Sequence, residues 1–158
     1  MIKYLIMDVD GTLTDGKINI GPVGEVMKSF SIKDGCGIHD ILPQKKITPI
    51  IITGRQSAIV EKRCKELGIT EIHQGVRDKE FMMMEILKTL YGSLSEVAYI
   101  GDDLPDLPCM EAVKKANGLI GCPFDACDEV IQIADYVSQK KGGEGAVRDF
   151  IEWIVKKN

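Results

Sequence analysis

Short apolar runs separated by longer mixed segments recur along the whole chain. Most of these runs are short, are rich in Ile, Val, Leu or Met, and lack the polar alternation of a half-exposed strand. Runs of this kind predict strands that are buried on both faces of a sheet. The predicted strands span residues 4–7, 48–55, 69–74, 96–100, 118–121 and 135–137.

The segments between these runs mostly carry helical periodicity. They predict helices at 38–45, 57–67, 79–90, 104–115, 124–133 and 146–156. Strands that alternate with helices of about ten residues predict an α/β fold with a doubly wound, mostly parallel sheet and helices on both faces.

Three connecting segments stand outside this alternation. Residues 17–30 form two alternating halves around a Gly/Pro turn and predict a β-hairpin that projects from the end of the first strand. Residues 33–37 predict a loop, with Asp34 as the default cap of the helix that follows and a position facing the site as the alternative. The Gly-rich stretch at 140–145 precedes the last helix, and its residues alone favour a flexible connector over an anion cradle.

Composition sets the boundaries of the interpretation. A chain of 158 residues with 44% hydrophobic residues predicts one domain over 1–158. The formal net charge of −4 offers no electrostatic reason to expect nucleic acid or an anionic membrane surface. No apolar run approaches the roughly 18 residues of a membrane span. Five cysteines without a dense framework, in a chain that opens directly on a strand, favour reduced thiols and a cytoplasmic location.

Acidic residues follow two of the predicted strands at the point where each strand ends. Asp8 and Asp10 follow the first strand, and Asp102, Asp103 and Asp106 follow the fourth. Because parallel strands bring their carboxyl ends to one edge of a sheet, these carboxylates are expected to converge there. Converging carboxylates repel one another unless a cation lies between them, and Mg²⁺ prefers oxygen ligands. The sequence therefore predicts a magnesium site.

Two further residues complete a set suited to phosphoryl transfer. Thr53 ends the second strand, where its hydroxyl and the following N–H groups suit phosphate oxygens. Lys79 lies in the first turn of a helix, where the helix dipole disfavours a cation, so a functional reason for it is expected. A phosphate monoester is dianionic and requires charge neutralisation and in-line attack. Asp8 is then a plausible nucleophile that forms an aspartyl-phosphate, and Asp10 a plausible acid and base.

These residues resemble the four motifs of the haloacid dehalogenase superfamily of phosphatases. The motifs are Asp8 to Thr12, Thr53, Lys79 and Gly101 to Asp106, in the family's order. The resemblance implies a Rossmann-like fold in which Asp8 is the nucleophile and Asp10 the acid/base. It also implies that the metal is held by the Asp8 side chain, the Asp10 backbone carbonyl and Asp102. Asp103 and Asp106 would support this arrangement.

A closer resemblance, over nearly the whole chain, is to the 3-deoxy-D-manno-octulosonate 8-phosphate phosphatase family. It is carried by residues 13–16, the hairpin, and residues 33–38, 52–55, 63–64, 74–75 and 142–148. The resemblance implies that there is no separate cap domain, that the hairpins of a homotetramer form a central barrel, and that a neighbouring subunit closes each active site. The implied substrate-binding residues are Ser31, Ile32, Lys33, Asp34, Gly35, His39, Gly54, Arg55, Arg63 and Lys79. The implied lid from a neighbouring subunit comprises Gly142, Gly143, Gly145 and Arg148.

Three functions stay open at this stage. The leading one is a Mg²⁺-dependent phosphatase of the eight-carbon sugar acid phosphate, which Arg55 favours because relatives that act on nine-carbon acids often carry Glu there. The second is a nine-carbon substrate, because octulosonate members often carry Arg where this chain has His39. The third is a phospho-switch or a silent scaffold. Receiver domains share similar residues, but their Lys follows the acidic cluster, whereas Lys79 precedes it here.

Overall fold

The sheet has six strands, all parallel. The computed structural model describes residues 1–158, and the strands lie in the order β5-β4-β1-β6-β7-β8. Their bounds are β1 Tyr4–Met7, β4 Thr48–Ile52, β5 Glu71–His73, β6 Val97–Ile100, β7 Leu119–Cys122 and β8 Tyr136–Val137. The order reverses at β1, as in Rossmann-like folds. The predicted doubly wound sheet is confirmed.

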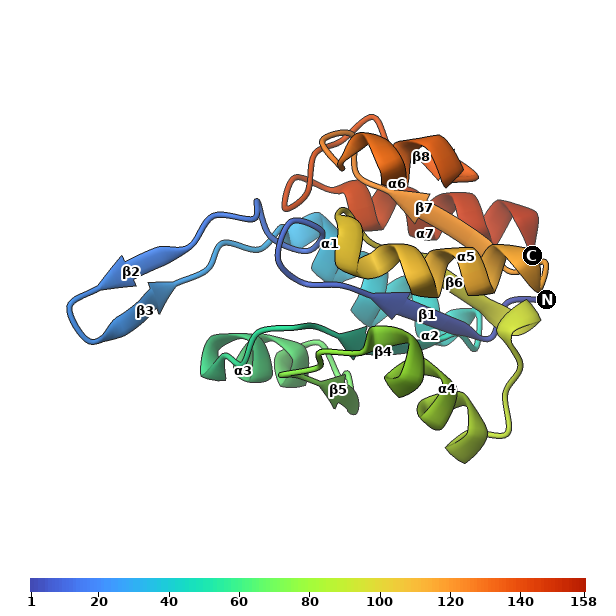
Figure 1. Ribbon diagram of the computed structural model, residues 1–158, viewed down its shortest axis with the longest axis horizontal. Coiled ribbons are helices and arrows are strands. Elements are labelled where there is room, and N and C mark those ends of the chain that lie inside the picture. The colour runs from blue at the N-terminus through green and yellow to red at the C-terminus, as the bar shows by residue number, and fades with distance from the viewer.

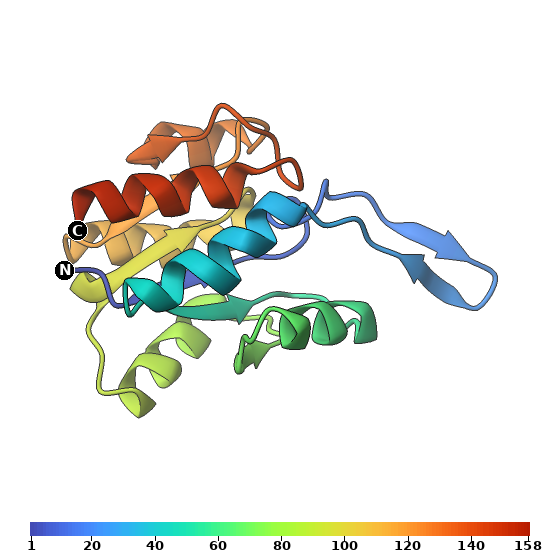
Figure 2. The same cartoon turned by 180° about the vertical axis from the view of Figure 1, so that it is seen from behind.

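Helices cover both faces of this sheet (Figures 1 and 2). One face carries α1 Ile32–Cys36, the π-helical turn η1 Gly37–Ile41, α2 Leu42–Gln44, α3 Ala58–Glu66 and α7 Ala146–Lys157. The other carries α4 Lys79–Thr89, α5 Leu107–Lys115 and α6 Asp128–Ile133, with short 3₁₀ turns η2 Leu94–Glu96 and η3 Leu104–Asp106. None of these helices combines the length and apolar composition needed to cross a membrane.

Two apolar cores result from the alternation of side chains along each strand. Leu5 and Met7 of β1 point into the core beneath α1, α3 and α7, whereas Ile6 points into the core beneath α4 and α5. A strand buried on both faces requires apolar residues at every position, which explains the unbroken runs in the sequence.

The predicted hairpin is confirmed and stands apart from the sheet. Its strands are β2 Asn19–Gly21 and β3 Gly24–Met27, paired antiparallel. It projects beyond the carboxyl ends of the sheet strands, and no separate domain covers that edge (Figure 1). The exposed large apolar side chains of the hairpin segment are Ile18, Ile20, Val23, Val26 and Met27.

The prediction of a loop at 33–37 and a helix from Ile38 is wrong, because the helical segment already begins at Ile32. The Ser31 hydroxyl accepts the backbone N–H of Lys33 and caps it. Gly35 and Gly37 indicated a loop, but both serve close packing inside the helix. A Cβ on Gly35 would lie 2.6 Å from the Arg63 guanidinium, and one on Gly37 would lie 3.0 Å from Ile151.

Asp34 does not cap the helix that contains it. Its carboxylate accepts the backbone N–H of Arg148 at 2.8 Å, and the residue is 1% exposed. Arg148 lies in the first turn of α7, whose own N-cap, Gly145, offers no side chain. Asp34 therefore caps α7 from a distant part of the chain and joins α1 to α7.

The last helix before the terminal one is also shorter than predicted. The sequence predicts it from Phe124, but α6 begins at Asp128. The backbone N–H of Phe124 instead donates to the carbonyl of Lys140 at 2.8 Å. This contact ties the turn after β7 to the Gly-rich loop and removes residues 124–127 from the helix.

Asp34→Ala is expected to lower the free energy of unfolding by about 1–2 kcal/mol, because the α7 N-terminus loses its acceptor. Asp34→Asn keeps a carbonyl oxygen there and is expected to cost less. Urea unfolding of both variants measures the difference. Equal losses in the two variants would show that the cap is not what Asp34 contributes.

Candidate active site

A polar cleft opens at the carboxyl ends of β1, β4 and β6. It has a volume of about 440 Å³. Its position is the switch point at which the strand order reverses, where open α/β sheets bind their ligands. The residues that line it are Asp8, Asp10, Thr53, Gly54, Arg55, Lys79, Asp103, Pro105 and Asp106.

A buried ammonium group joins two strands at the base of the cleft. The Lys79 Nζ lies 2.8 Å from Asp8 Oδ1, which follows β1, and 2.8 Å from Asp106 Oδ1, which follows β6. Lys79 is only 6% exposed. These two carboxylates explain why a cation occupies the first turn of α4 against the helix dipole.

Asp106 is fully occupied by donors from its own chain. Besides Lys79, its Oδ1 accepts the Tyr99 hydroxyl at 2.8 Å. Its Oδ2 accepts the backbone N–H groups of Asp102 at 3.0 Å and Asp103 at 3.3 Å. Asp106 therefore holds Lys79 and the loop after β6 in place, which supports its predicted supporting role. Tyr99, a buried strand residue, carries no sequence signal for this contact.

Asp102 reaches across to the loop after β1. Its Oδ1 accepts the Thr12 hydroxyl at 2.9 Å. Its Oδ2 lies so close to Gly11 that a Cβ there would sit 2.0 Å from it. Gly11 also has a φ of +92°, which side-chain-bearing residues rarely adopt. Glycine is thus required at position 11 for both backbone conformation and space.

Burial and mutual repulsion shift the protonation of these carboxyls. Burial, together with the Asp106 charge, raises the pKa of Asp8 to about 6. Burial, together with the charges of Asp8 and Asp106, raises the pKa of Asp102 to about 8. Burial alone would lower the pKa of Lys79, but the facing carboxylates raise it above its usual range. The cluster holds more negative charge than one lysine compensates.

The donor set fits a divalent cation. Asp8, Asp102 and Asp106 each offer a carboxylate oxygen, and these oxygens lie within 4.8 Å of one another. Because Asp106 is saturated by four donors, Asp8 and Asp102 have the greater capacity for a metal. All these ligands are hard oxygens, as Mg²⁺ prefers. The predicted side-chain ligands, Asp8 and Asp102, are therefore brought together.

Asp10 is paired with a residue that the sequence reasoning missed. Its carboxylate forms an ion pair with Lys28, which follows β3 of the hairpin. The Lys28 Nζ also lies 2.9 Å from Glu25, and Glu25 lies 3.8 Å from Arg55. The sequence feature that indicated this contact is the pair Glu25 and Lys28, two charged residues three positions apart on an otherwise apolar arm of the hairpin. The base of the hairpin therefore meets the cleft.

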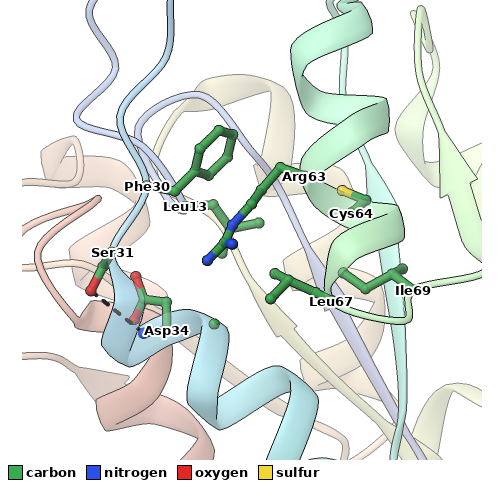
Figure 3. Close-up of a pocket in the computed structure, with 9 residues that line it drawn as sticks. Leu13, Phe30, Ser31, Asp34, Arg63, Cys64, Leu67 and Ile69 are labelled. Carbon is green, nitrogen blue, oxygen red and sulfur yellow. Dashed lines mark hydrogen bonds between the residues drawn. The ribbon is translucent and has the colours of Figure 1, made fainter.

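Several predicted substrate residues lie instead around a second, small and mainly apolar pocket (Figure 3). In Figure 3, Arg63 extends from α3 toward α1, with Ser31 and Asp34 on the opposite wall and Phe30 nearby. The lining also includes Gly35. The structure thus groups Gly54, Arg55 and Lys79 with Asp8 and Asp10 in the polar cleft. Ser31, Asp34, Gly35 and Arg63 lie together around the second pocket.

The remaining predicted contacts lie farther out. Ile32 and His39 line a surface groove between α1 and α3, where the His39 side chain is 58% exposed and pairs with Asp40. Lys33 is exposed, and its carbonyl accepts from the Arg148 guanidinium at 3.5 Å.

The Gly-rich loop packs against its own chain. The Gly143 N–H donates to the Thr12 carbonyl at 3.2 Å. A Cβ on Gly142 would lie 1.9 Å from the Gly11 carbonyl oxygen. Gly145 is the N-cap of α7. These contacts give no support to the predicted lid over a neighbouring subunit. Within its own chain, the Gly-rich loop packs against the backbone of Gly11 and Thr12, which lies next to Asp102.

Comparison with known proteins identifies the family. No protein-family model matches the chain. Over 154 residues, the chain is 44% identical to the 3-deoxy-D-manno-octulosonate 8-phosphate phosphatase KdsC of Escherichia coli K12, covering 98% of this chain and 79% of the relative. The chain belongs to the KdsC family. KdsC of Yersinia pestis is 43% identical, with 98% and 80% of the two chains covered.

Solved structures of KdsC-type phosphatases share the fold. The Moraxella catarrhalis enzyme, in complex with magnesium, phosphate and KDO, has a TM-score of 0.90 and 43% identity over 98% of this chain and 86% of its own. The cobalt-bound Haemophilus influenzae enzyme has a TM-score of 0.90 and 36% identity over 98% and 88% of the two chains. The prediction of a capless haloacid dehalogenase-type fold is confirmed.

Without metal, the protein is expected to lose stability as the pH rises from about 4 to about 8, because the folded state binds Asp8 and Asp102 protons more tightly than the unfolded chain. Saturating Mg²⁺ is expected to reverse this loss and raise the melting temperature by about 5–10 °C. Thermal melts at several pH values, with and without EDTA, measure both effects.

Asp102→Asn provides the comparison for these melts. It removes one buried charge, so the metal-free loss with pH should shrink and the Mg²⁺ response should disappear. The exposed Asp128→Asn is the matched control and should behave as wild type. A full Mg²⁺ response in Asp102→Asn would contradict the assignment of Asp102 as a ligand.

Proposed function

We propose that this chain hydrolyses 3-deoxy-D-manno-octulosonate 8-phosphate to the free sugar acid and inorganic phosphate, with Mg²⁺ as cofactor. The observation that carries the proposal is Lys79 held between Asp8 and Asp106 at the switch point, with Asp10 and Thr53 in the same cleft. The family membership supports both the reaction and the substrate.

In the first half of the reaction, Asp8 attacks phosphorus. Lys79 binds Asp8 Oδ1, which leaves Oδ2 as the attacking atom. The bond from phosphorus to the sugar oxygen breaks as the aspartyl-phosphate forms, and Asp10 gives its proton to the departing oxygen. Lys79 and the Thr53 hydroxyl offset charge on the phosphoryl oxygens. Magnesium, held by the Asp8 and Asp102 side chains and the Asp10 carbonyl, supplies the further positive charge that a phosphate dianion requires.

In the second half, water replaces the sugar. Asp10, now ionised, takes a proton from the water as its oxygen bonds to phosphorus. The bond between phosphorus and Asp8 breaks, phosphate leaves, and both aspartates regain their starting states. Asp10 therefore acts first as an acid and then as a base, so its position matters in both steps.

Substrate selection is assigned to Arg55 at the mouth of the cleft. Its side chain is half exposed and next to Gly54, within reach of a ligand bound above Asp8. A guanidinium suits a sugar-acid carboxylate because it offers two parallel donors. A nine-carbon sugar acid phosphate is the second candidate, because octulosonate members of the family often carry Arg where this chain has His39. The His39 side chain is 58% exposed in a single subunit, which is too exposed to select a substrate alone.

We also propose a homotetramer built around the hairpins, in the cytoplasm. The hairpin presents exposed Ile20, Val23 and Val26 and pairs with no other strand. A two-stranded hairpin is marginal by itself, so burial of these side chains against other copies would stabilise it. Five free thiols suit a reducing compartment.

Phosphate release from three compounds tests the function: octulosonate 8-phosphate, a nonulosonate 9-phosphate and 4-nitrophenyl phosphate. We expect the first to have the highest kcat/KM and EDTA to abolish all turnover. Preference for the second would move the assignment to nine-carbon acids. Absence of release from all three would favour a switch or scaffold. Asp8→Asn should lose turnover by at least about 10³-fold while keeping its fold, because the nucleophile is gone.

Arg55→Ala is expected to raise KM for the sugar acid phosphate by about 10-fold or more, through loss of a charged hydrogen bond to the carboxylate. The kinetics of 4-nitrophenyl phosphate, which has no carboxylate, should change less than about 3-fold. Steady-state kinetics on both substrates provide the comparison. An equal loss on both would assign Arg55 to the phosphate instead.

A further inference from the structure

We propose that Lys28 is a positioning residue that holds the Asp10 carboxylate in its reactive orientation and thereby couples the hairpin to the active site. The proposal rests on the proposed function, in which Asp10 transfers protons. Lys28 stands outside the four motifs and was not among the predicted site residues. Its role follows from three contacts at the base of the hairpin.

The first contact is the ion pair itself. The Lys28 Nζ binds Asp10 Oδ1, and its side chain is only 1% exposed. Asp10 lines the cleft, and its Oδ2 has no partner among the side-chain hydrogen bonds of the chain. Lys28 thus holds Oδ1 of Asp10, whereas Oδ2 stays available to exchange a proton with the leaving-group oxygen or the attacking water. Because Lys28 is enclosed and does not line the cleft, it acts through Asp10 rather than on substrate.

The second contact anchors Lys28. Its Nζ lies 2.9 Å from the Oε1 of Glu25, which precedes it by three residues on the same hairpin arm. Glu25 Oε2 accepts the Ser57 hydroxyl at 2.6 Å. Ser57 is buried, caps α3, and its N–H donates to Gln74 at 2.9 Å. The series of contacts from Asp10 through Lys28 and Glu25 therefore ends at Ser57, the N-cap of α3, and not in a loop.

The third feature is the balance of charge. A buried lysine with a single carboxylate partner would be left uncompensated whenever that carboxylate took up a proton. Glu25 prevents this, because it remains paired with Lys28 while Asp10 gives and receives a proton. The second carboxylate is therefore what allows a buried cation to sit beside an acid/base group.

These contacts also link the position of the hairpin to the position of the Asp10 carboxylate. Glu25 and Lys28 flank the exposed apolar residues Val26 and Met27 on the same arm. A shift of this arm would move Lys28 relative to Asp10. An error of about 1 Å in the placement of a reacting group is enough to cost on the order of 100-fold in rate. Order in the hairpin is therefore expected to be a condition for efficient proton transfer.

Phosphate esters with different leaving groups distinguish a positioning role of Lys28 from a purely structural role. The alkoxide of a sugar phosphate requires a proton from Asp10, whereas 4-nitrophenolate leaves readily without one. Lys28→Met is expected to lower kcat/KM, which reports the first half of the reaction, on the order of 100-fold for octulosonate 8-phosphate and for a simple alkyl phosphate. The loss of kcat/KM for 4-nitrophenyl phosphate should be under about 5-fold, because its first half needs no proton from Asp10. Lys28→Arg, which keeps a cationic donor, should recover part of the loss.

Controls assign the effect to the contact. Lys17→Met removes a hairpin lysine that has no ion pair and should match wild type on every substrate. Glu25→Gln should reproduce the leaving-group pattern of Lys28→Met in weaker form. Oligomeric mass and melting temperature are measured for each variant. Equal losses on alkyl and aryl phosphates, or no loss on either, would overturn the proposal.

A crystal structure of Lys28→Met supplies a readout that needs no substrate. We expect the Asp10 side chain to lose its single orientation, whereas Lys17→Met should retain it. An unchanged, singly ordered Asp10 in Lys28→Met would overturn the positioning role even in a protein with no measurable turnover. A wild-type preference for a different phosphate ester would change the proposed substrate and leave the alkyl-to-aryl comparison intact.

Discussion

The buried contact of Lys79 with Asp8 and Asp106 is the interaction on which the site depends. It joins the end of β1, the end of β6 and the start of α4, three elements that the doubly wound topology brings to one edge. Removing the ammonium would leave two buried carboxylates close together without a counter-charge, which is strongly destabilising. The same lysine binds Asp8, the proposed nucleophile, so stability and the proposed chemistry depend on one group. This coupling explains why a cation is kept at the start of a helix.

Around this contact the chain provides less positive charge than negative. Asp8, Asp102 and Asp106 face one lysine, and burial together with the mutual repulsion of the carboxylates raises the pKa values of Asp8 and Asp102. This excess of negative charge favours the binding of a divalent cation, which would in turn offset the charge of a phosphate dianion. Backbone support is correspondingly tight: Gly11 and Gly142 are packed so closely that neither tolerates a side chain. The loop under the metal ligands is thereby rigid.

The hairpin also affects the geometry of the site. No cap domain lies over the cleft, and Lys28, which is paired with Glu25 on the same hairpin arm, contacts Asp10 from the base of the hairpin. The apolar side chains of the hairpin point to contacts with other copies of the chain. The proposed assembly and the proposed proton transfer therefore depend on the same hairpin, which would order the site of a phosphatase that has no cap domain.

The sequence by itself determined the sheet, its doubly wound character and the convergence of Asp8, Asp10, Thr53, Lys79 and Asp102. These follow from local signals, namely apolar runs and the polar residues that end them, combined with the rule that parallel strands align their carboxyl ends. Only the tertiary structure decided contacts between residues that are distant along the chain. Asp34 caps α7 rather than its own helix, Gly35 and Gly37 make room for neighbouring side chains, and Lys28 meets Asp10. Such contacts depend on how finished elements pack, and no periodicity or propensity along the chain encodes them.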